Sequence, residues 1–531
     1  MDNQSSLNKL QTSQSIAPAL SRLRKTLGDE RVSEKTHKYE IATFESNKKI
    51  LAVIYPNTTE QVADCLKIAN EFKLSIYPVS GGKNYGLGST VPNVSGSLIL
   101  DLKHLNRIYD YDEELAHVTL EAGVTFKQLE QFLEDEGGRL IMDGIGSTPE
   151  ASIVGNTVER GHGMGLYADR LDHVCAMEVV LPNGSIINTG FERYGENKVA
   201  KLSKWGLGPA LDGIFTQSSF GIVTRLTMWL RPKPKFFQSL IIHAPTSDQM
   251  AVLVDRFRQM RLDGLNVSMR IFNDYRLVAF SSQYHNLKNN TKDYLSQEDI
   301  DKNKPEGSGQ WIGIAGLYSF SPLHAKAERE FILDTLKDQD LAIEVIDKEE
   351  ADLRVRQDPS KREEMDFFFY KSSLAGYTTD KAINMCYWRV PGEIPSKKDI
   401  HKDSCGLYWY CPVIPCRGKD ALIAANKIQE ISYKYALEPN IGFLFISERA
   451  LDITGAICFN KQNPEEAERA AKCHDEILES MLQLGYPPYR LGIQSMNMFS
   501  NTETYSQDLL KRLKTTLDPH NVLAAKRYSS L

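Results

Sequence analysis

Alternating runs of apolar and polar residues divide the first part of the chain into short strands and amphipathic helices. The apolar run at 50–56 predicts a buried strand, and the pattern over 57–73 predicts a helix capped at Thr58 or Thr59. A second strand is expected over 74–80, where the sequence becomes rich in glycine. The pattern therefore predicts a strand–helix–strand unit that leads the chain into a glycine loop.

Local signals continue the same patterning toward the C-terminus. A helix is expected to begin at Thr125, because Gln128 stands where a capping box requires it. Residues 173–190 predict a hairpin whose turn contains an Asn-Gly pair. Residues 236–480 alternate between strands and amphipathic helices, which is typical of an antiparallel sheet with helices on one face. We therefore predict an α+β fold with a boundary near residue 235.

The bulk composition limits the classes of function. A chain of 531 residues exceeds what one hydrophobic core organises, so more than one domain is expected. The net charge of −6 argues against a nucleic-acid partner, and no apolar run is long enough to span a membrane. The polar N-terminal segment lacks the apolar core of a secretory signal, so a cytoplasmic location is expected. None of the eight cysteines forms a Cys-x-x-Cys pair, so no metal site is expected.

The glycine-rich segment SGGKNYGLGS, residues 80–89, is the strongest chemical signal. Glycines let backbone N–H groups approach a ligand closely. The segment departs from a Walker A loop, because Asn84 follows the Gly-Lys pair where serine or threonine is required. It departs from a Rossmann fingerprint, because the third glycine is missing and Pro92 follows. On these residues alone, a structural turn and another kind of phosphate loop both stay open.

Six stretches of the chain together resemble the flavoprotein family of vanillyl-alcohol oxidase and p-cresol methylhydroxylase. They run in the family's order from about residue 40 to 527: SGGKNYGLGS, EAGVTF, GNTVERGHGMGLYADRLDHVCAMEVVLPNG, WGLGPALDGIFTQSSFGIVTRLTMWLRPKP, GYPPYR and DPHNVLAAKR. The resemblance implies a two-part FAD-binding domain and an antiparallel-sheet cap domain over the flavin ring. The implied division is an N-terminal tail and helix (1–40), the FAD-binding domain (41–235), the cap domain (236–485) and a C-terminal segment returning to the FAD domain (486–531).

The resemblance also implies which residues hold FAD. The opening glycine loop would grip the diphosphate, and a second glycine-rich segment about seventy residues later would complete the grip. Arg527 would lie near the pyrimidine end of the flavin, where a positive charge stabilises the reduced anion. The implied cofactor-binding residues are Pro78, Ser80, Gly81, Gly82, Lys83, Asn84, Tyr85, Gly86, Ser89, Gly155, Asn156, Gly161, Gly221, Ile222 and Arg527.

Three residues match the family's catalytic positions. Tyr489 and Arg490 would hold a para-substituted phenol as its phenolate, because a hydroxyl donor and a guanidinium both favour the charged form. Hydride could then leave the para side chain and produce a quinone methide. Asp169 would act as a base for the attacking water or stabilise the intermediate. Taken singly, the three also suit an exposed tyrosine, an ion-paired arginine and a helix-capping aspartate.

The sequence departs from the family pattern at the expected substrate pocket. Leu87 stands where a second phenol-binding tyrosine is usual, and Tyr85 is the residue that could replace it. Leu407 stands where the oxidases carry the histidine that links FAD covalently. FAD is therefore expected to bind without a covalent bond, with linkage through Tyr387 as the minor alternative and linkage through Cys386 or Cys405 as a weaker one.

The leading hypothesis is an FAD-dependent oxidoreductase that removes hydride from a benzylic carbon of a small aromatic substrate. A para-substituted phenol is the first candidate for that substrate. The alternative is a flavin-dependent tailoring oxidase of a non-phenolic specialised metabolite, which the apolar Leu87 favours. A non-catalytic flavin-binding subunit is the third hypothesis. By resemblance, a homodimer is expected, with oxygen or a cytochrome as the electron acceptor.

Overall fold

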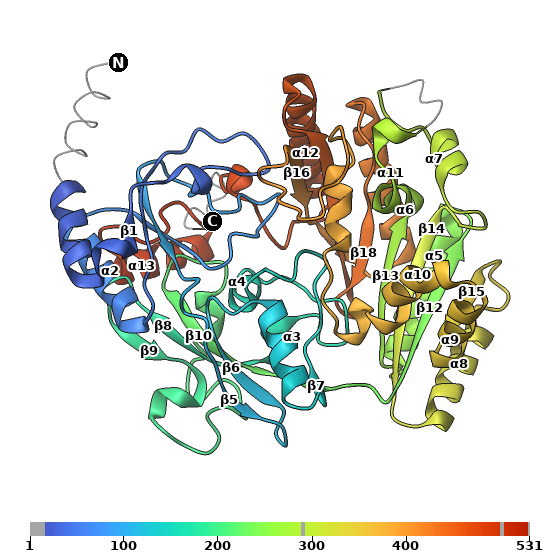
Figure 1. Ribbon diagram of the computed structural model, residues 1–531, viewed down its shortest axis with the longest axis horizontal. Coiled ribbons are helices and arrows are strands. Elements are labelled where there is room, and N and C mark those ends of the chain that lie inside the picture. The colour runs from blue at the N-terminus through green and yellow to red at the C-terminus, as the bar shows by residue number, and fades with distance from the viewer. Residues whose placement is uncertain (1–15, 288–292, 500–503, 529–531) are drawn as a thin grey trace.

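The computed structural model describes residues 16–287, 293–499 and 504–528, so the predicted polar tail at 1–15 lies outside the described residues. Figure 1 shows two lobes side by side. The N-terminal lobe, drawn in blue to green, also carries the last helix, α13 (Tyr505–Leu517). The cap lobe, drawn in green-yellow to orange, is built around the largest sheet. The predicted α+β class is confirmed.

A strand–helix–strand unit opens the N-terminal lobe, as predicted. Helix α2 (Thr59–Phe72) begins after Thr58, whose side chain accepts a hydrogen bond from the Gln61 N–H. The helix lies between strands that belong to one four-stranded sheet, in which the last three strands are parallel. In sheet order the strands are β1 (Val32–Ser33), β2 (Ile50–Ile54), β4 (Ser97–Asp101) and β3 (Ile76–Val79).

An antiparallel five-stranded sheet completes this lobe. Its order is β5 (Ile108–Asp112), β6 (His117–Glu121), β10 (Ile222–Trp229), β8 (Val174–Val180) and β9 (Ile186–Asn188). The predicted hairpin is the β8–β9 pair. Helix α3 (Phe126–Asp135) has the predicted capping box between Thr125 and Gln128. The short helix α4 (Ile153–Val158) and the strand pair β7 (Leu140–Ile141) and β11 (Arg231–Pro232) fill the space toward the cap lobe.

The cap lobe contains a seven-stranded antiparallel sheet. Its order is β15 (Ala342–Ile346), β12 (Phe236–Ala244), β14 (Trp311–Ser319), β13 (Val267–Asn273), β18 (Gly442–Phe445), β19 (Ala450–Ile453) and β17 (Val413–Pro415). The helices that contact it are α5 (Ser247–Leu262), α8 (Pro322–Leu336), α9 (Lys348–Gln357) and α11 (Gly418–Lys434), and α12 (Pro464–Gln483) packs on α11. A separate pair, β16 (Cys405–Tyr410) with β20 (Gly455–Asn460), and the helices α6 (Asp274–Ser281), α7 (Gln297–Asn303) and α10 (Arg362–Met365) complete the lobe.

Alternation along the central strands gives the cap sheet two different faces. In β13, Met269 and Ile271 pack into the apolar core shared with α5 and α11. Arg270, between them, belongs to the opposite face, because successive side chains of a strand point to opposite sides. One face of the sheet therefore packs against α5 and α11, whereas the other carries Arg270 together with a second apolar cluster that includes Phe272, Ile312 and Ile314.

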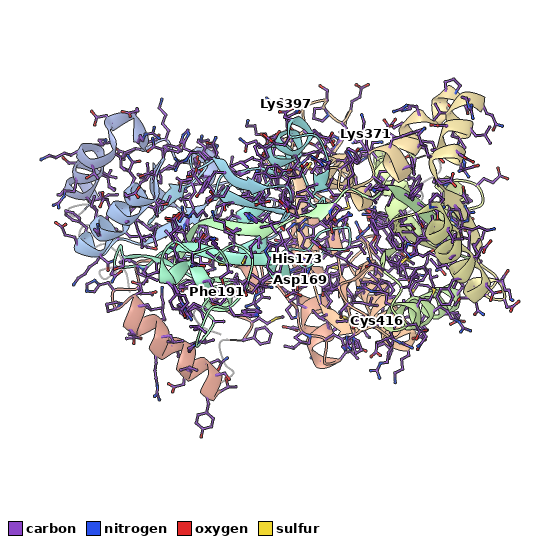
Figure 2. All side chains as sticks on the ribbon, turned by 90° about the horizontal axis from the view of Figure 1, so that it is seen from below. Asp169, His173, Phe191, Lys371, Lys397 and Cys416 are labelled. Carbon is purple, nitrogen blue, oxygen red and sulfur yellow. The ribbon has the colours of Figure 1, made fainter. Side chains whose placement is uncertain are left out.

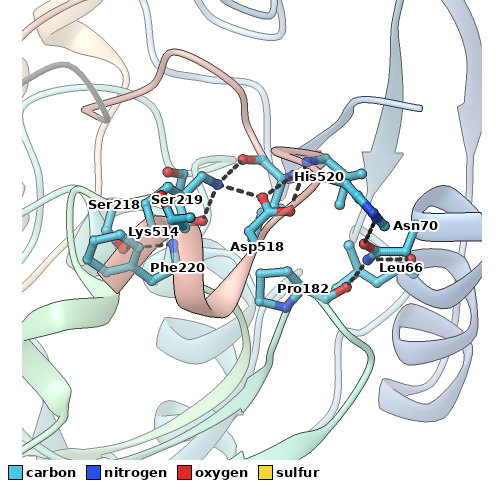
Figure 3. Close-up of polar contacts among 12 residues, drawn as sticks. Leu66, Asn70, Pro182, Ser218, Ser219, Phe220, Lys514, Asp518 and His520 are labelled. Atoms are coloured by element: carbon cyan, nitrogen blue, oxygen red, sulfur yellow. Dashed lines mark hydrogen bonds and ion pairs between the residues drawn. The ribbon is translucent and has the colours of Figure 1, made fainter. Parts of the chain in front are cut away.

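The end of the chain packs against the N-terminal lobe, as Figure 3 shows. Lys514 of α13 donates from Nζ to a carboxylate oxygen of Asp518 at 2.6 Å and to the carbonyl oxygens of Ser219 and Leu523, each at 2.9 Å. The Ile76 N–H donates to the carbonyl of Val522 at 2.7 Å. This contact places the C-terminal segment beside β3, the strand that leads into the glycine segment. The residue boundaries of the domains stay a prediction.

Candidate functional site

One cavity of about 370 Å³ is lined by residues of both lobes. The N-terminal lobe contributes the glycine segment 80–89, the loop region around 145–164 and the start of β10. The cap lobe contributes residues of β13 and β18 in its large sheet and parts of α6 and β16. The C-terminal segment adds Tyr489, Arg490 and Arg527. Segments far apart in the sequence therefore meet at one site.

The glycine segment presents a row of backbone donors to this cavity. Within the described parts of the chain, the N–H groups of residues 81–85 have no hydrogen-bond acceptor, whereas the Gly86 N–H donates to Thr43 Oγ1 at 2.9 Å. Gly82 has φ of +64°, and a Cβ there would lie 2.6 Å from the methyl group of Thr90. Successive free N–H groups in such a turn form a concave anion site. The arrangement suits a phosphate or diphosphate group.

Nearly all of the predicted cofactor-binding residues line the cavity. The members that do so are Pro78, Ser80, Gly81, Gly82, Lys83, Asn84, Tyr85, Ser89, Gly155, Asn156, Gly161, Gly221, Ile222 and Arg527. Gly86 is not among the described lining residues. Its carbonyl accepts a hydrogen bond from the Trp409 N–H at 3.3 Å, and a Cβ would clash with the Trp409 ring. Gly86 therefore lets the glycine segment pack closely against β16 of the cap lobe.

Tyr489 and Arg490 both reach the cavity. The Arg490 guanidinium donates to Asn84 Oδ1 at 2.8 Å, which connects it to the glycine segment. The Tyr489 ring lies edge-on to the His162 ring, with centroids 5.0 Å apart. Burial raises the pKa of Tyr489 well above its ordinary value, so its hydroxyl stays a neutral donor. A cation and a hydroxyl donor therefore stand side by side on one wall.

Glu159 joins the two arginines of this wall and was missed by the sequence interpretation. Its carboxylate lies 2.5 Å from Arg527 Nη2 and 3.8 Å from Arg490 Nε. Arg527 also donates to the Tyr77 hydroxyl at 2.8 Å. Although burial works against the cation, the Glu159 carboxylate holds the pKa of Arg527 above its ordinary value. Glu159 stands inside one of the quoted stretches, but only folding brings it to two arginines more than 300 positions later.

A second acid–base pair was also missed. His162 Nε2 lies 2.8 Å from a carboxylate oxygen of Asp452, which is buried on β19. Burial raises the pKa of Asp452, and the hydrogen bond from His162 works in the opposite direction. The His162 ring of this pair lies beside the Tyr489 ring. No local signal in the sequence connects residues that are so far apart.

Asp169 is not among the described residues that line the cavity. Its carboxylate accepts a hydrogen bond from the Leu171 N–H at 3.2 Å and so caps a short 3-10 helix, Arg170–His173. Figure 2 labels Asp169 beside His173, near the middle of the molecule in that view. The predicted role of Asp169 as a base stays a prediction.

The predicted substrate residues form an apolar part of the wall. Leu87, Leu407 and Tyr85 all line the cavity and are buried. The Tyr85 ring lies edge-on to His401, with centroids 5.0 Å apart. Tyr387 is not in the described lining, and its hydroxyl donates to Asp403 at 2.6 Å. Leu87 therefore offers only apolar contact, and Tyr85, which carries a hydroxyl, lines the same cavity.

Comparison with known proteins finds relatives along nearly the whole chain. Residues 50–190 match the family described as an FAD binding domain. The 1'-carboxy-chondrochloren decarboxylase of Chondromyces crocatus is 36% identical over 527 residues, covering 97% of each chain. The 4-cresol dehydrogenase (hydroxylating) flavoprotein subunit of Pseudomonas putida is 28% identical over 484 residues, covering 90% of this chain and 87% of the relative.

Solved structures show the same similarity. The structure of p-cresol methylhydroxylase with substrate bound has a TM-score of 0.87 and 26% identity, and covers 97% of each chain. The 4-ethylphenol oxidase from Gulosibacter chungangensis, in its isoeugenol complex, has a TM-score of 0.88, 25% identity and the same coverage. In the described part of the chain, no helix is both long and apolar enough to cross a membrane.

Proposed function

Since the chain belongs to the p-cresol methylhydroxylase family of FAD-dependent flavoproteins, we propose that it removes hydride from a benzylic carbon of an aromatic substrate whose phenol group is held by Tyr489 and Arg490. The predicted enzyme class, an FAD-dependent oxidoreductase, and the predicted cofactor are confirmed by the relatives. The substrate and the roles of single residues are the proposal.

The residues present fit FAD. The free N–H groups of residues 81–85 suit its diphosphate, and Arg527 supplies a cation at the same cavity. Bound FAD supplies the acceptor for the hydride. We expect it to bind without a covalent bond, because Leu407 has no nucleophilic atom and the Tyr387 hydroxyl is engaged by Asp403. Acid precipitation tests this: yellow colour in the supernatant is expected, and colour in the pellet would contradict it.

The observation that carries the proposal is the position of Tyr489 and Arg490 in the cavity that the N–H row also faces. A free phenol has a pKa of about 10. A fixed guanidinium and a neutral hydroxyl donor favour the phenolate and lower that value. A phenolate pushes electron density toward its para carbon, which makes hydride loss from the para side chain easier. The His162–Asp452 pair can exchange the proton of a water that then attacks.

A second candidate is a tailoring oxidation of a non-phenolic specialised metabolite. The apolar side chains of Leu87 and Leu407 favour it, because they offer no polar group to a substrate at their part of the cavity wall. The Chondromyces relative is named a decarboxylase of 1'-carboxy-chondrochloren, so relatives of this chain are not confined to cresol as a substrate. Both candidates use the same bound flavin and differ in what Tyr489 and Arg490 contact.

Flavin reduction without oxygen tests the proposal. We expect the yellow protein to bleach when 4-ethylphenol or vanillyl alcohol is added anaerobically. No bleaching by a wide set of para-substituted phenols would contradict the phenol substrate and favour the second candidate. Reoxidation by air, compared with a cytochrome c, then identifies the electron acceptor. A homodimer and a cytoplasmic location belong to the same proposal, and light scattering and fractionation test them.

A further inference from the structure

Two arginines of the cap lobe line the cavity without an acidic partner. Arg270 lies on β13, and Arg276 lies in the first turn of α6, which follows β13 directly. In residues 16–287, 293–499 and 504–528, no carboxylate lies within ion-pair distance of either guanidinium. The two guanidinium groups are close enough that the positive charge of Arg270 contributes to lowering the pKa of Arg276. Two half-buried like charges therefore share one wall.

Their hydrogen bonds leave donors of both guanidinium groups unused. Arg270 donates to the Met164 sulfur at 3.1 Å and to Ser373 Oγ at 3.5 Å, and its buried Nε has no acceptor. Arg276 donates to Asn440 Oδ1 at 2.8 Å and to the Thr454 carbonyl at 2.5 Å. All of these acceptors are neutral. Burial lowers the pKa of each guanidinium to about 10, so both stay charged at neutral pH.

The residues that line the cavity carry more positive than negative charges. The cationic lining residues are Lys83, Arg270, Arg276, Arg490 and Arg527, whereas Glu159 is the single carboxylate among the described lining residues. A bound diphosphate is a dianion and would balance two of these cations, and Glu159 balances one more. A positive surplus is left on the cap face. A buried charge without a partner is costly, so a surplus of this kind indicates an anionic ligand.

We propose that Arg270 and Arg276 form a subsite that binds the carboxylate of the substrate. The planar guanidinium fork matches a carboxylate with two parallel hydrogen bonds, and a carboxylate accepts from both arginines at once. This inference rests on the proposed function, because it assigns the far end of the same substrate. It narrows the substrate class to aromatic carboxylates.

Strand register sets the length of such a substrate. Arg270 pairs with Leu444 on β18, and Leu444 pairs with Asp452 on β19. Arg270 and Asp452 are therefore two strand spacings apart, roughly 10 Å between Cα atoms. Asp452 contacts His162, which lies against the Tyr489 ring. A ring at Tyr489 and a carboxylate at Arg270 thus correspond to an aryl group with a short acid side chain.

Binding of two dead-end ligands tests the subsite. We choose 4-hydroxycinnamate and its neutral amide, which have no sp3 benzylic hydrogen to donate, and titrate each into the oxidised holoenzyme while following the flavin spectrum. We expect the carboxylate to bind about 10-fold more tightly than the amide or better, as charge-assisted hydrogen bonds imply. Equal affinity, or no binding of either ligand, overturns the subsite.

Variants assign the preference to the two side chains. R270Q and R276Q are each expected to reduce the carboxylate preference at least severalfold, and R270K and R276K to keep part of it. The matched control is R261Q: Arg261 is a half-buried cap-lobe arginine that donates to the Phe445 carbonyl at 2.9 Å and does not line the cavity. A preference that survives in R270Q and R276Q overturns the subsite, as does loss of FAD instead of the preference.

The failure of this inference differs from failure of the proposed function. If 4-ethylphenol bleaches the flavin while the acid and the amide bind equally, the benzylic oxidation stands and the carboxylate subsite falls. If the acid binds selectively while no phenol bleaches the flavin, the subsite stands and the phenol chemistry falls. The binding measurement needs no turnover, so each result is obtained separately.

Discussion

The two walls of the cavity are built on different principles. The wall of the N-terminal lobe presents backbone N–H groups, held by glycines and by short local contacts. The wall of the cap lobe presents side chains from the antiparallel sheet and from α6, among them Arg270, Arg276 and Leu444. A backbone wall can hold any ligand that carries a diphosphate, whereas a side-chain wall can change with a single substitution. We infer that the first wall keeps the cofactor and the second selects the substrate.

The largest expected effect tests how the C-terminal segment supports the N-terminal lobe through Lys514. In K514M, the buried Asp518 carboxylate loses its ion pair, and the loss of one partner of such a pair costs about 3–5 kcal/mol. Burial lowers the pKa of Lys514, and the Asp518 carboxylate works in the opposite direction. The buried positive charge of Lys514 therefore depends on its ion pair with Asp518. The free energy of unfolding in urea measures the effect.

The matched control for K514M lies on the same helix. Lys511 is exposed on α13, so K511M is expected to change the free energy of unfolding by less than about 0.5 kcal/mol. Equal effects of the two variants would mean that the C-terminal segment does not support the N-terminal lobe through Lys514.

The second largest effect is expected at Arg490. R490Q removes the cation proposed to hold the phenolate, and the loss of one preorganised charge contact slows a reaction about 100-fold or more. Anaerobic stopped-flow reduction of the flavin by 4-ethylphenol measures the rate. R449Q is the control, because Arg449 is exposed and pairs with its neighbour Glu448. An unchanged rate in R490Q would remove Arg490 from the proposed phenol site.

A smaller effect appears where the two walls touch. His401 of the cap lobe shares a 2.7 Å hydrogen bond with Ser89 Oγ of the glycine segment. Burial and the nearby Lys83 charge lower the pKa of His401 to about 4, from 6.5 for the free side chain. The unfolded chain therefore binds a proton that the folded chain does not between these values, and stability falls as the pH is lowered through this window.

The size of this pH effect follows from the two pKa values. Between pH 7.5 and pH 5, His401 is expected to account for about 2 kcal/mol of lost stability. Urea unfolding of the wild type and of H401Q at both pH values measures the difference, and the pH dependence should be flatter in H401Q. Parallel curves for the two proteins would show that His401 does not titrate in this way.

The same two walls explain how much the sequence could reveal. Helix α2, the capping box at Thr125 and the β8–β9 hairpin depend on neighbouring residues, and the structure confirms each of them. The N–H row at 81–85 was also foreseeable, because glycines clustered in a short segment let backbone N–H groups approach a ligand closely. These features are local in the chain.

Most of the side-chain wall could not be predicted, because its residues are far apart in the sequence. The contact between His162 and Asp452 joins positions almost 300 residues apart, and Arg270 reads in the sequence as one polar residue within an alternating strand. The resemblance to a known family supplied Tyr489 and Arg490, but it gave no sign of Arg276. The same resemblance supplied Asp169, whose carboxylate caps a 3-10 helix and lies outside the described lining, and its role as a base stays a prediction.

The smallest expected effect tests the backbone wall itself. Gly82 has φ of +64°, and in G82A the new Cβ would lie 2.6 Å from the Thr90 methyl group. A left-handed backbone costs an alanine about 1–2 kcal/mol, so relief of this strain should tilt the N–H row and weaken FAD binding about 10-fold. Quenching of FAD fluorescence by the deflavinated protein measures the dissociation constant. G96A is the matched control: Gly96 also has positive φ, at +85°, but a Cβ there would meet nothing within 4 Å, and the residue does not line the cavity. If G82A binds FAD as tightly as G96A does, the free N–H groups are not what holds the cofactor, and side chains such as Arg527 must hold it instead. The contrast between a backbone wall and a side-chain wall would then no longer separate cofactor from substrate.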